Sequence, residues 1–227
     1  MTESSLADPI RSSLAGAHAR FAITRGRISR YHPEVSVFYG HPRELTADDY
    51  GDAVALAGPG GTVGFRDRAS RLPGGWESLE TFGLILFDGT AFEAEPAGDD
   101  VVTLTSADVP EMTALVRRTD PGPFLPRTIE LGTYIGIRGV DGALLAMAGE
   151  RMRPDGWTEI SAVCTAPEAR GRGYATRLLR AVAHGIRARG DEVFLHTGAA
   201  NPARRLYTSL GFTEFSEVPL ELVRVPR

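Results

Sequence analysis

The chain has 227 residues, of which 42% are hydrophobic and 24% are charged, and its formal net charge is −4 at pH 7. This composition is typical of a globular protein with a sizeable core, and it excludes an intrinsically disordered chain. The mild negative charge provides no electrostatic attraction to nucleic acid or to an anionic membrane. All 25 basic residues are arginine, and a single cysteine, Cys164, excludes an internal disulfide and a thiolate-based zinc site.

The sequence predicts no segment that would target or anchor the protein. The polar opening MTESSLADP has no basic and apolar regions of a secretory signal, and no window reaches the roughly 18 apolar residues of a membrane span. The five histidines show no metal-ligand spacing, so we expect no metal. We expect a cytoplasmic protein with no nucleic-acid or membrane partner, and a homodimer is left open.

The first part of the chain predicts a smaller α/β domain over residues 1–95. Its predicted elements are a helix through Leu6, Ile10, Leu14 and Phe21, a helix over Thr46–Ala57, and strands at Thr62–Arg66 and Leu79–Phe87. The basic, aromatic segment Arg25–Tyr39 is expected to pack against the remainder of the chain. Residues 93–100, EAEPAGDD, are acidic and poor in apolar side chains, which predicts a linker.

Residues 101–227 predict a second domain with a mixed α/β sheet, because hairpin strands come first and are then joined through helices. The predicted strands are Val101–Leu104, Tyr134–Arg138, Leu144–Glu150, Trp157–Thr165, Glu192–His196, residues 212–215 and Leu220–Val223. Helices are predicted after the capping box Thr105-x-x-Asp108, over Arg172–Arg189, and over Pro202–Leu210. The proline-rich residues 120–128 predict a loop.

A glycine-rich turn, Arg170-Gly-Arg-Gly173, joins the predicted strand Trp157–Thr165 to the long helix. The first N–H groups of a helix have no internal partner, and glycines let a phosphate approach closely, so this turn predicts an anion site. A mononucleotide P-loop is excluded because the chain has no lysine. The match to a dinucleotide fingerprint is weak, since only about 55 residues follow it. The pyrophosphate of coenzyme A is the remaining candidate ligand for this anion site.

The turn resembles the acyl-CoA signature of the GNAT N-acetyltransferases, Arg/Gln-x-x-Gly-x-Gly/Ala, which Arg170, Gly173 and Ala175 match. The preceding Val163-x-Thr165 and the later LYxxLGF, ending at Phe212, are also similar to the family, above all to its FR47-like group. The resemblance covers residues 101–227 and implies the GNAT fold with acetyl-CoA as co-substrate. It implies acyl-CoA contacts at Val163, Cys164, Thr165, Arg170, Gly171, Arg172, Gly173, Tyr174, Ala175, Thr176 and Asn201.

The resemblance also implies catalytic roles. Glu159, on the strand that leads into the motif, resembles the family's base glutamate, and we expect burial to raise its pKa. Glu150 and a chain of water molecules are the alternatives. Tyr207 resembles the general acid that protonates the departing thiolate. Asn201 departs from the pattern, since it stands two residues before Ala203 and relatives have three.

We expect no chemical role for two further residues. Cys164 is expected to be a buried apolar side chain, and His196 a core or rim histidine. Residues 120–128, with Phe124 and Arg127, and Tyr134 beyond them, are expected to form the acceptor wall. The predicted function is N-acetyl transfer from acetyl-CoA to a primary amine of a small molecule, or to a peptide N-terminus, by direct attack. A non-catalytic acyl-CoA-binding regulatory module is the alternative, and a nicotinamide oxidoreductase is disfavoured by chain length.

Overall fold

The computed structural model describes residues 5–227, so the first four residues of the polar opening lie outside the described part. Its main feature is an eight-stranded mixed sheet in the order β4-β11-β5-β10-β9-β8-β7-β6, beside a three-stranded sheet of β1, β2 and β3. The strands are β1 (Ala22–Arg25), β2 (Ile28–Tyr31), β3 (Tyr39–Gly40), β4 (Thr62–Arg66), β5 (Glu77–Asp88), β6 (Val101–Leu104), β7 (Tyr134–Arg138), β8 (Leu144–Glu150), β9 (Trp157–Thr165), β10 (Glu192–Gly198) and β11 (Thr213–Arg224).

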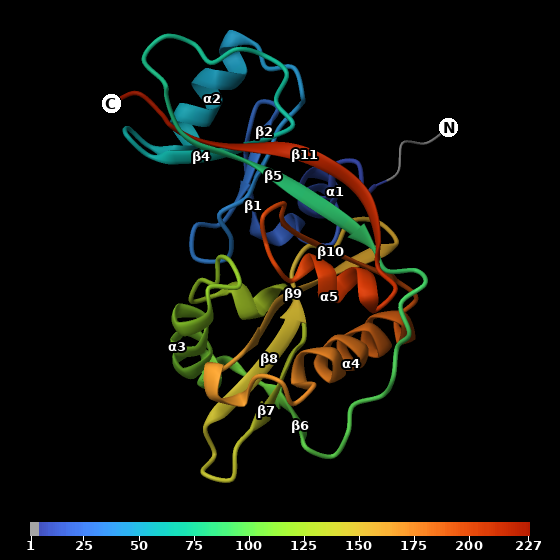
Figure 1. The fold of residues 1–227 in the computed structure, drawn as a ribbon. Helices are drawn as coiled ribbons and strands as arrows, with labels where there is room; N and C mark the ends of the chain where they lie inside the picture. Colours follow the sequence, from blue (N-terminus) through green and yellow to red (C-terminus); the bar gives the residue numbers. More distant parts are fainter. Residues whose placement is uncertain (1–4) are drawn as a thin grey trace.

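In the described part of the chain, five α-helices pack around these sheets: α1 (Pro9–Ala15), α2 (Ala47–Ala57), α3 (Val109–Thr119), α4 (Tyr174–Ala188) and α5 (Arg204–Ser209). The lower part of Figure 1 shows α4 lying against one face of the β7–β10 strands, with α3 on the other side. The predicted amphipathic pattern of α4 is confirmed, since Leu178, Leu179, Val182 and Ile186 are all buried. The main core therefore lies between α4 and the sheet, together with Phe87 and Phe212.

Two long antiparallel strands, β5 and β11, run between the upper and lower parts of the molecule (Figure 1). We predicted two short strands near the C-terminus, and this was wrong: β11 is continuous over 12 residues. A register shift lies between Glu214 and Ser216. Pro219 pairs with Gly83 of β5, and the Asp67 amide just beyond β4 donates to the Pro219 carbonyl over 2.8 Å. The missing N–H of Pro219 lies on the β4 side of β11, where the ladder ends at Leu220.

The eight-stranded sheet contains strands from both predicted domains. β5 pairs with β10 on one side and with β11 on the other, although both of these strands come more than 100 residues after β5 in the chain. The division at residues 93–100 stays a prediction. That segment forms no helix or strand, and it lies along α4 through the ion pairs Glu95–Arg180 and Asp100–Arg177.

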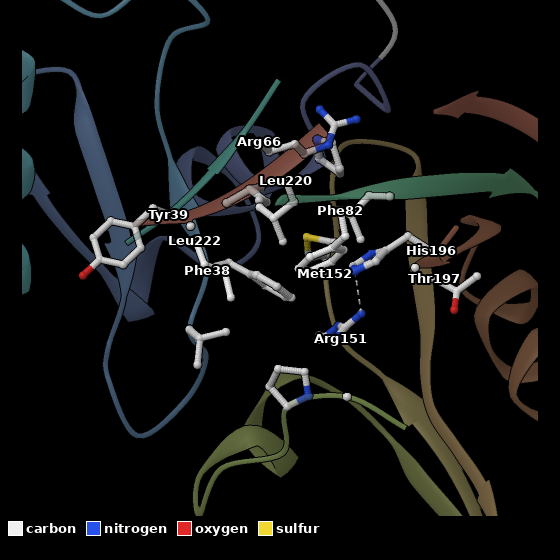
Figure 2. Close-up of a pocket in the computed structure, with 18 of the residues that line it drawn as sticks. Phe38, Tyr39, Arg66, Phe82, Arg151, Met152, His196, Thr197, Leu220 and Leu222 are labelled. Atoms are coloured by element: carbon white, nitrogen blue, oxygen red, sulfur yellow. Dashed lines mark hydrogen bonds between the residues drawn. The ribbon is translucent and has the colours of Figure 1, made fainter. Parts of the chain in front are cut away.

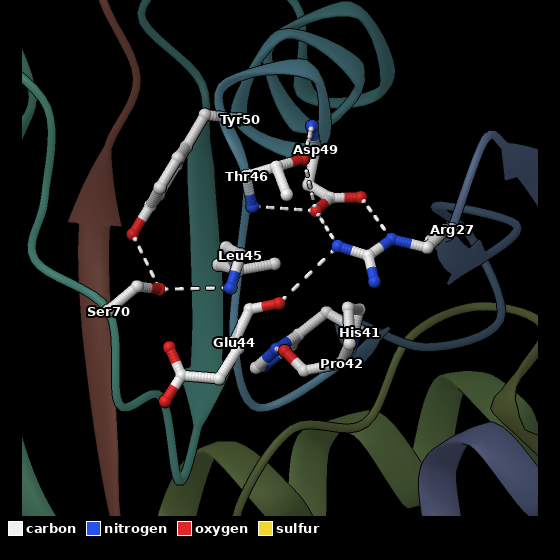
Figure 3. A network of polar contacts seen from close by, with 9 residues as sticks. All are labelled: Arg27, His41, Pro42, Glu44, Leu45, Thr46, Asp49, Tyr50 and Ser70. Atoms are coloured by element: carbon white, nitrogen blue, oxygen red, sulfur yellow. Dashed lines mark hydrogen bonds and ion pairs between the residues drawn. The ribbon is translucent and has the colours of Figure 1, made fainter.

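The helix α2 begins where the sequence predicts it. Thr46 and Asp49 form a reciprocal capping box, and Gly58 follows the last helical residue. Figure 3 shows Arg27, from the β1–β2 turn, donating Nε–H to Asp49 Oδ1 over 3.0 Å. This ion pair holds the pKa of Asp49 at about 2, because the hydrogen bond from Arg27 outweighs the effect of burial. It joins α2 to the small sheet. Within the described residues, no helix is long and apolar enough to cross a membrane.

Candidate active site

The strands β9 and β10 separate at the point where a cavity opens. Their parallel pairing runs only from Trp157↔Glu192 to Glu159↔Phe194, although both strands continue further. Opposite β8, the strand β9 also carries a bulge, at which Ala162 has a φ of +52°. A cavity of about 530 Å³ occupies the gap, and its lining includes six of the predicted site residues: Val163, Cys164, Thr165, Arg170, Asn201 and Tyr207. We refer to it as the strand-gap cavity.

The glycine-rich turn lies beside this cavity and is open on its outer side. Gly171 and Gly173 have φ values of +77° and +75°, and a Cβ atom built on either would meet no heavy atom within 4 Å. Arg170 and Arg172 make only long contacts to backbone oxygens, of 3.5 and 3.3 Å. The predicted contacts Tyr174, Ala175 and Thr176 form the first turn of α4 and do not line the strand-gap cavity.

Glu159 lies beneath the cavity in a buried ionic cluster. Its side chain is 0% exposed, and Arg151 donates to both carboxylate oxygens over 2.9 and 2.7 Å. His196 Nδ1 lies 2.7 Å from Glu159 Oε1, and the Met152 amide donates to Oε2 over 3.2 Å. The expected raised pKa is wrong. Burial favours the neutral acid, but the charge of Arg151 and the hydrogen bonds from Arg151 and His196 outweigh it and hold the pKa of Glu159 well below its usual range.

The cluster determines which nitrogen of His196 carries the proton. Arg151 Nη2 lies 3.2 Å from His196 Nε2, and a guanidinium can only donate a hydrogen bond. Nε2 therefore accepts this hydrogen bond, and Nδ1 donates to Glu159. We did not predict Arg151 as a site residue. The predicted hairpin of β8 and β9 could have indicated it, because the pairing of these strands places Arg151 opposite Glu159. The Arg151 amide pairs with the Glu159 carbonyl across this hairpin.

Tyr207 and Asn201 approach the strand-gap cavity from α5 and the loop before it. The Tyr207 ring packs edge-on against Phe87 and Phe212, and burial raises the pKa of its hydroxyl, which therefore stays protonated. Asn201 Oδ1 accepts the Ala203 amide over 2.9 Å. This contact closes a local turn in which the side chain of Asn201 bonds to the backbone two positions on.

Two other candidate residues, Cys164 and Glu150, are buried. Cys164 is buried, which raises the pKa of its thiol to about 11 and makes it a poor nucleophile. Glu150 is also buried, and its carboxylate lies 2.8 Å from Arg189. Among the described residues, no group of three or more potential ligands could hold a metal ion.

A second and larger cavity, of about 710 Å³, adjoins the first. We call it the acceptor chamber. Figure 2 shows Phe38, Phe82, Leu220 and Leu222 around it, with Arg151 and His196 at its inner end. The two cavities share six lining residues: Asp120, Pro121, Arg151, His196, Thr197 and Asn201. A molecule in the chamber and a molecule in the strand gap would therefore meet at His196.

Only part of the segment predicted as the acceptor wall lines the chamber. Asp120 to Pro123 line the chamber, but Phe124 and Tyr134 are buried and pack against each other. Arg127 is held by Glu130 and does not line the chamber. As expected, the segment Arg25–Tyr39 packs against the other half of the chain. Its Phe38 ring lies 4.9 Å from the Arg151 guanidinium and 5.8 Å from the His196 ring.

Comparisons with known proteins agree with this geometry. A family model described as FR47-like protein matches residues 134–219. A crystal structure from Novosphingobium aromaticivorans, assigned to the GNAT acetyltransferase family, is 33% identical, with a TM-score of 0.87; the match covers 99% of this chain and 100% of that one. The chain belongs to the GNAT family of acetyltransferases.

A more distant match shows the same fold. A GCN5-related N-acetyltransferase from Kribbella flavida is 17% identical, with a TM-score of 0.58 and coverage of 96% of each chain. A search of curated proteins finds no significant match. GNAT membership and the mixed sheet predicted from the sequence are thus both confirmed.

Proposed function

We propose that the chain transfers an acetyl group from acetyl-CoA to the primary amine of a small molecule. The observation that carries this proposal is the meeting of the two cavities at His196. The strand-gap cavity, with Val163, Cys164 and Thr165 on β9, suits an extended pantetheine arm. The open turn at Gly171 and Gly173 suits the pyrophosphate, since free amides and two arginines face solvent there. A cytoplasmic location and a homodimer stay predictions.

The acyl-CoA contacts at Arg170, Arg172, Tyr174, Ala175, Thr176 and Asn201 belong to the same proposal. Beyond Glu159, β9 still pairs with β8 but has no ladder partner in β10, so its backbone amides on the β10 side can donate to a ligand. An amide that faces the thioester oxygen stabilises the oxyanion formed during attack. One such donor is worth about 3 kcal/mol of activation free energy.

The proposed mechanism is direct attack. The amine nitrogen adds to the thioester carbonyl carbon, the C–N bond forms, and the C–S bond breaks. A primary amine is mostly protonated at neutral pH, so a base must remove a proton. His196 Nε2 is suited to this, because it lies at the junction of the two cavities. It accepts the amine proton in place of the 3.2 Å contact from Arg151, whose guanidinium keeps its two hydrogen bonds to Glu159. Tyr207 gives its hydroxyl proton to the departing sulfur, and solvent restores both groups.

In this proposal Glu159 acts through His196 and does not take the proton itself. Its carboxylate already accepts from Arg151, His196 and Met152, and it lines neither cavity. A buried carboxylate with a lowered pKa is a weak base, but it holds the proton of the imidazole on Nδ1 and stabilises the imidazolium that forms. Glu159 is therefore proposed as a positioning residue.

Isothermal titration with acetyl-CoA tests the proposed function, with Gly173→Val as the disrupted variant. Valine strongly disfavours a φ of +75°, and its side chain would fill the space that a phosphate needs. We expect wild-type protein to bind acetyl-CoA and the variant to bind at least tenfold more weakly. Gly74→Val, in an exposed loop with a normal φ, is the control. Absence of acetyl-CoA binding by the wild type would refute the proposal.

A further inference from the structure

The wall of the acceptor chamber is formed by one face of three adjacent strands. Side chains alternate between the two faces of a strand, and directly paired residues share a face. The register pairs Leu220 with Phe82 and Val218 with Leu84, and it places Gly64 beside Leu222. All of these residues line the chamber, together with Leu86 and, across from them, Phe38 and Met152. The surface is therefore continuous and apolar.

The volume of this chamber and the apolar side chains that line it suit a bulky molecule. At about 710 Å³ it has the volume of sites for drug-sized ligands, which range from about 300 to 1,000 Å³. The segment from Arg30 to Tyr39 forms its outer side and belongs to the part of the chain outside the family match at 134–219. Apolar side chains that face a cavity of this size favour an apolar occupant, because contact removes their surface from water.

The charges around the chamber argue against a polycationic acceptor. The charged lining residues are Arg30, Arg66, Arg151 and Asp120, and Arg151 is neutralised by Glu159. Arg30 donates to the Leu56 carbonyl and Arg66 to the Ala7 carbonyl, and within the described residues neither has a salt bridge, although the charges of Asp8 and Asp67 act on Arg66. A molecule with several ammonium groups would meet repulsion here. Asp120 lies where the chamber meets the strand gap, which places the negative charge beside the reacting amine.

We infer that the acceptor is a monoamine on a bulky apolar body, with the body in the chamber and the amine at His196. This inference rests on the proposed function and specifies its substrate class. Specificity then depends on the β4–β11–β5 face. The side chains that form this face lie outside the acyl-CoA motif.

Gly64→Val tests the inference with little risk to folding. A Cβ atom at Gly64 would lie 3.4 Å from Leu222 and 3.5 Å from Leu220, which is ordinary contact, and valine suits a strand. Its two methyl groups would reduce the space for the body of the acceptor. Release of the CoA thiol is measured with 2-(1-naphthyl)ethylamine, ethylamine, kanamycin and a tripeptide with a free N-terminus. The matched control is Gly74→Val.

We expect wild-type kcat/KM for the naphthyl amine to exceed the values for the other three acceptors by at least about tenfold. Gly64→Val should lower it about tenfold and leave acetyl-CoA affinity unchanged. Preference for kanamycin, the tripeptide or ethylamine would overturn the inference. Acetyl-CoA binding without acetylation of the naphthyl amine would also overturn the inference. The same holds if Gly64→Val lowers activity only with octanoyl-CoA as the acyl donor, because the chamber would then hold the acyl chain and not the acceptor. If the wild-type protein does not bind acetyl-CoA, the proposed function itself fails, which is a distinct outcome.

Discussion

Removal of the guanidinium from the buried cluster, by Arg151→Met, is expected to destabilise the fold strongly. The Arg151 side chain is 8% exposed and Glu159 is 0% exposed, so the substitution leaves a buried carboxylate without its main partner. Only the His196 ring and the Met152 amide would remain as donors to it. Breaking one side of such a pair costs about 3–5 kcal/mol of the free energy of unfolding. This is a large part of the about 5–15 kcal/mol that a typical domain has.

The loss should depend on pH in a direction that identifies its cause. In the wild type the pKa of Glu159 is lowered, so its stabilising contribution is present above the unfolded pKa of about 4.3 and declines only as the pH falls through the lowered value. In Arg151→Met, burial without the guanidinium raises that pKa. The variant then loses stability as the pH rises through the raised value, so the difference is largest near neutral pH and shrinks toward pH 4.

Urea denaturation at several pH values, followed by tryptophan fluorescence, measures these differences, since Trp157 lies on the same strand as Glu159. The exposed pair of Arg224 and Glu77 gives the control, Arg224→Met, for which we expect a small change. The double variant Arg151→Met/Glu159→Leu should recover most of the loss, because no unpaired charge remains. The reasoning is refuted if Arg151→Met costs no more than Arg224→Met, or if its loss does not shrink toward acid pH.

Two further predictions concern the proposed chemistry. His196→Gln should lower kcat by about 10²–10⁴-fold with acetyl-CoA affinity unchanged; an unaltered kcat would exclude His196 as the base. Tyr207→Phe keeps the ring packing against Phe87 and Phe212 but removes the hydroxyl, so kcat should fall by about 10²-fold at unchanged thermal stability, and a thiol-release assay with unaltered kcat would contradict the role.

The sequence by itself determined the elements whose signals are local. The strands Tyr134–Arg138, Leu144–Glu150 and Trp157–Thr165 have the predicted bounds, because tight turns rich in glycine and proline separate them. The helix α4 follows its apolar periodicity and ends before Gly190, and α2 follows its capping box. Recognition of the GNAT family also came from contiguous motifs, which need no knowledge of distant contacts.

Only the tertiary structure decided the charge state of Glu159 and the shape of the acceptor site. Arg151, Glu159 and His196 come from three chain segments, and a pKa depends on the charges that folding brings within a few ångströms. The chamber likewise needs β5 and β11 to pair across more than 120 residues, which places two alternating apolar patterns on one face. Each pattern alone predicts a half-buried strand, and neither indicates whether its apolar face meets a helix, another sheet or a cavity.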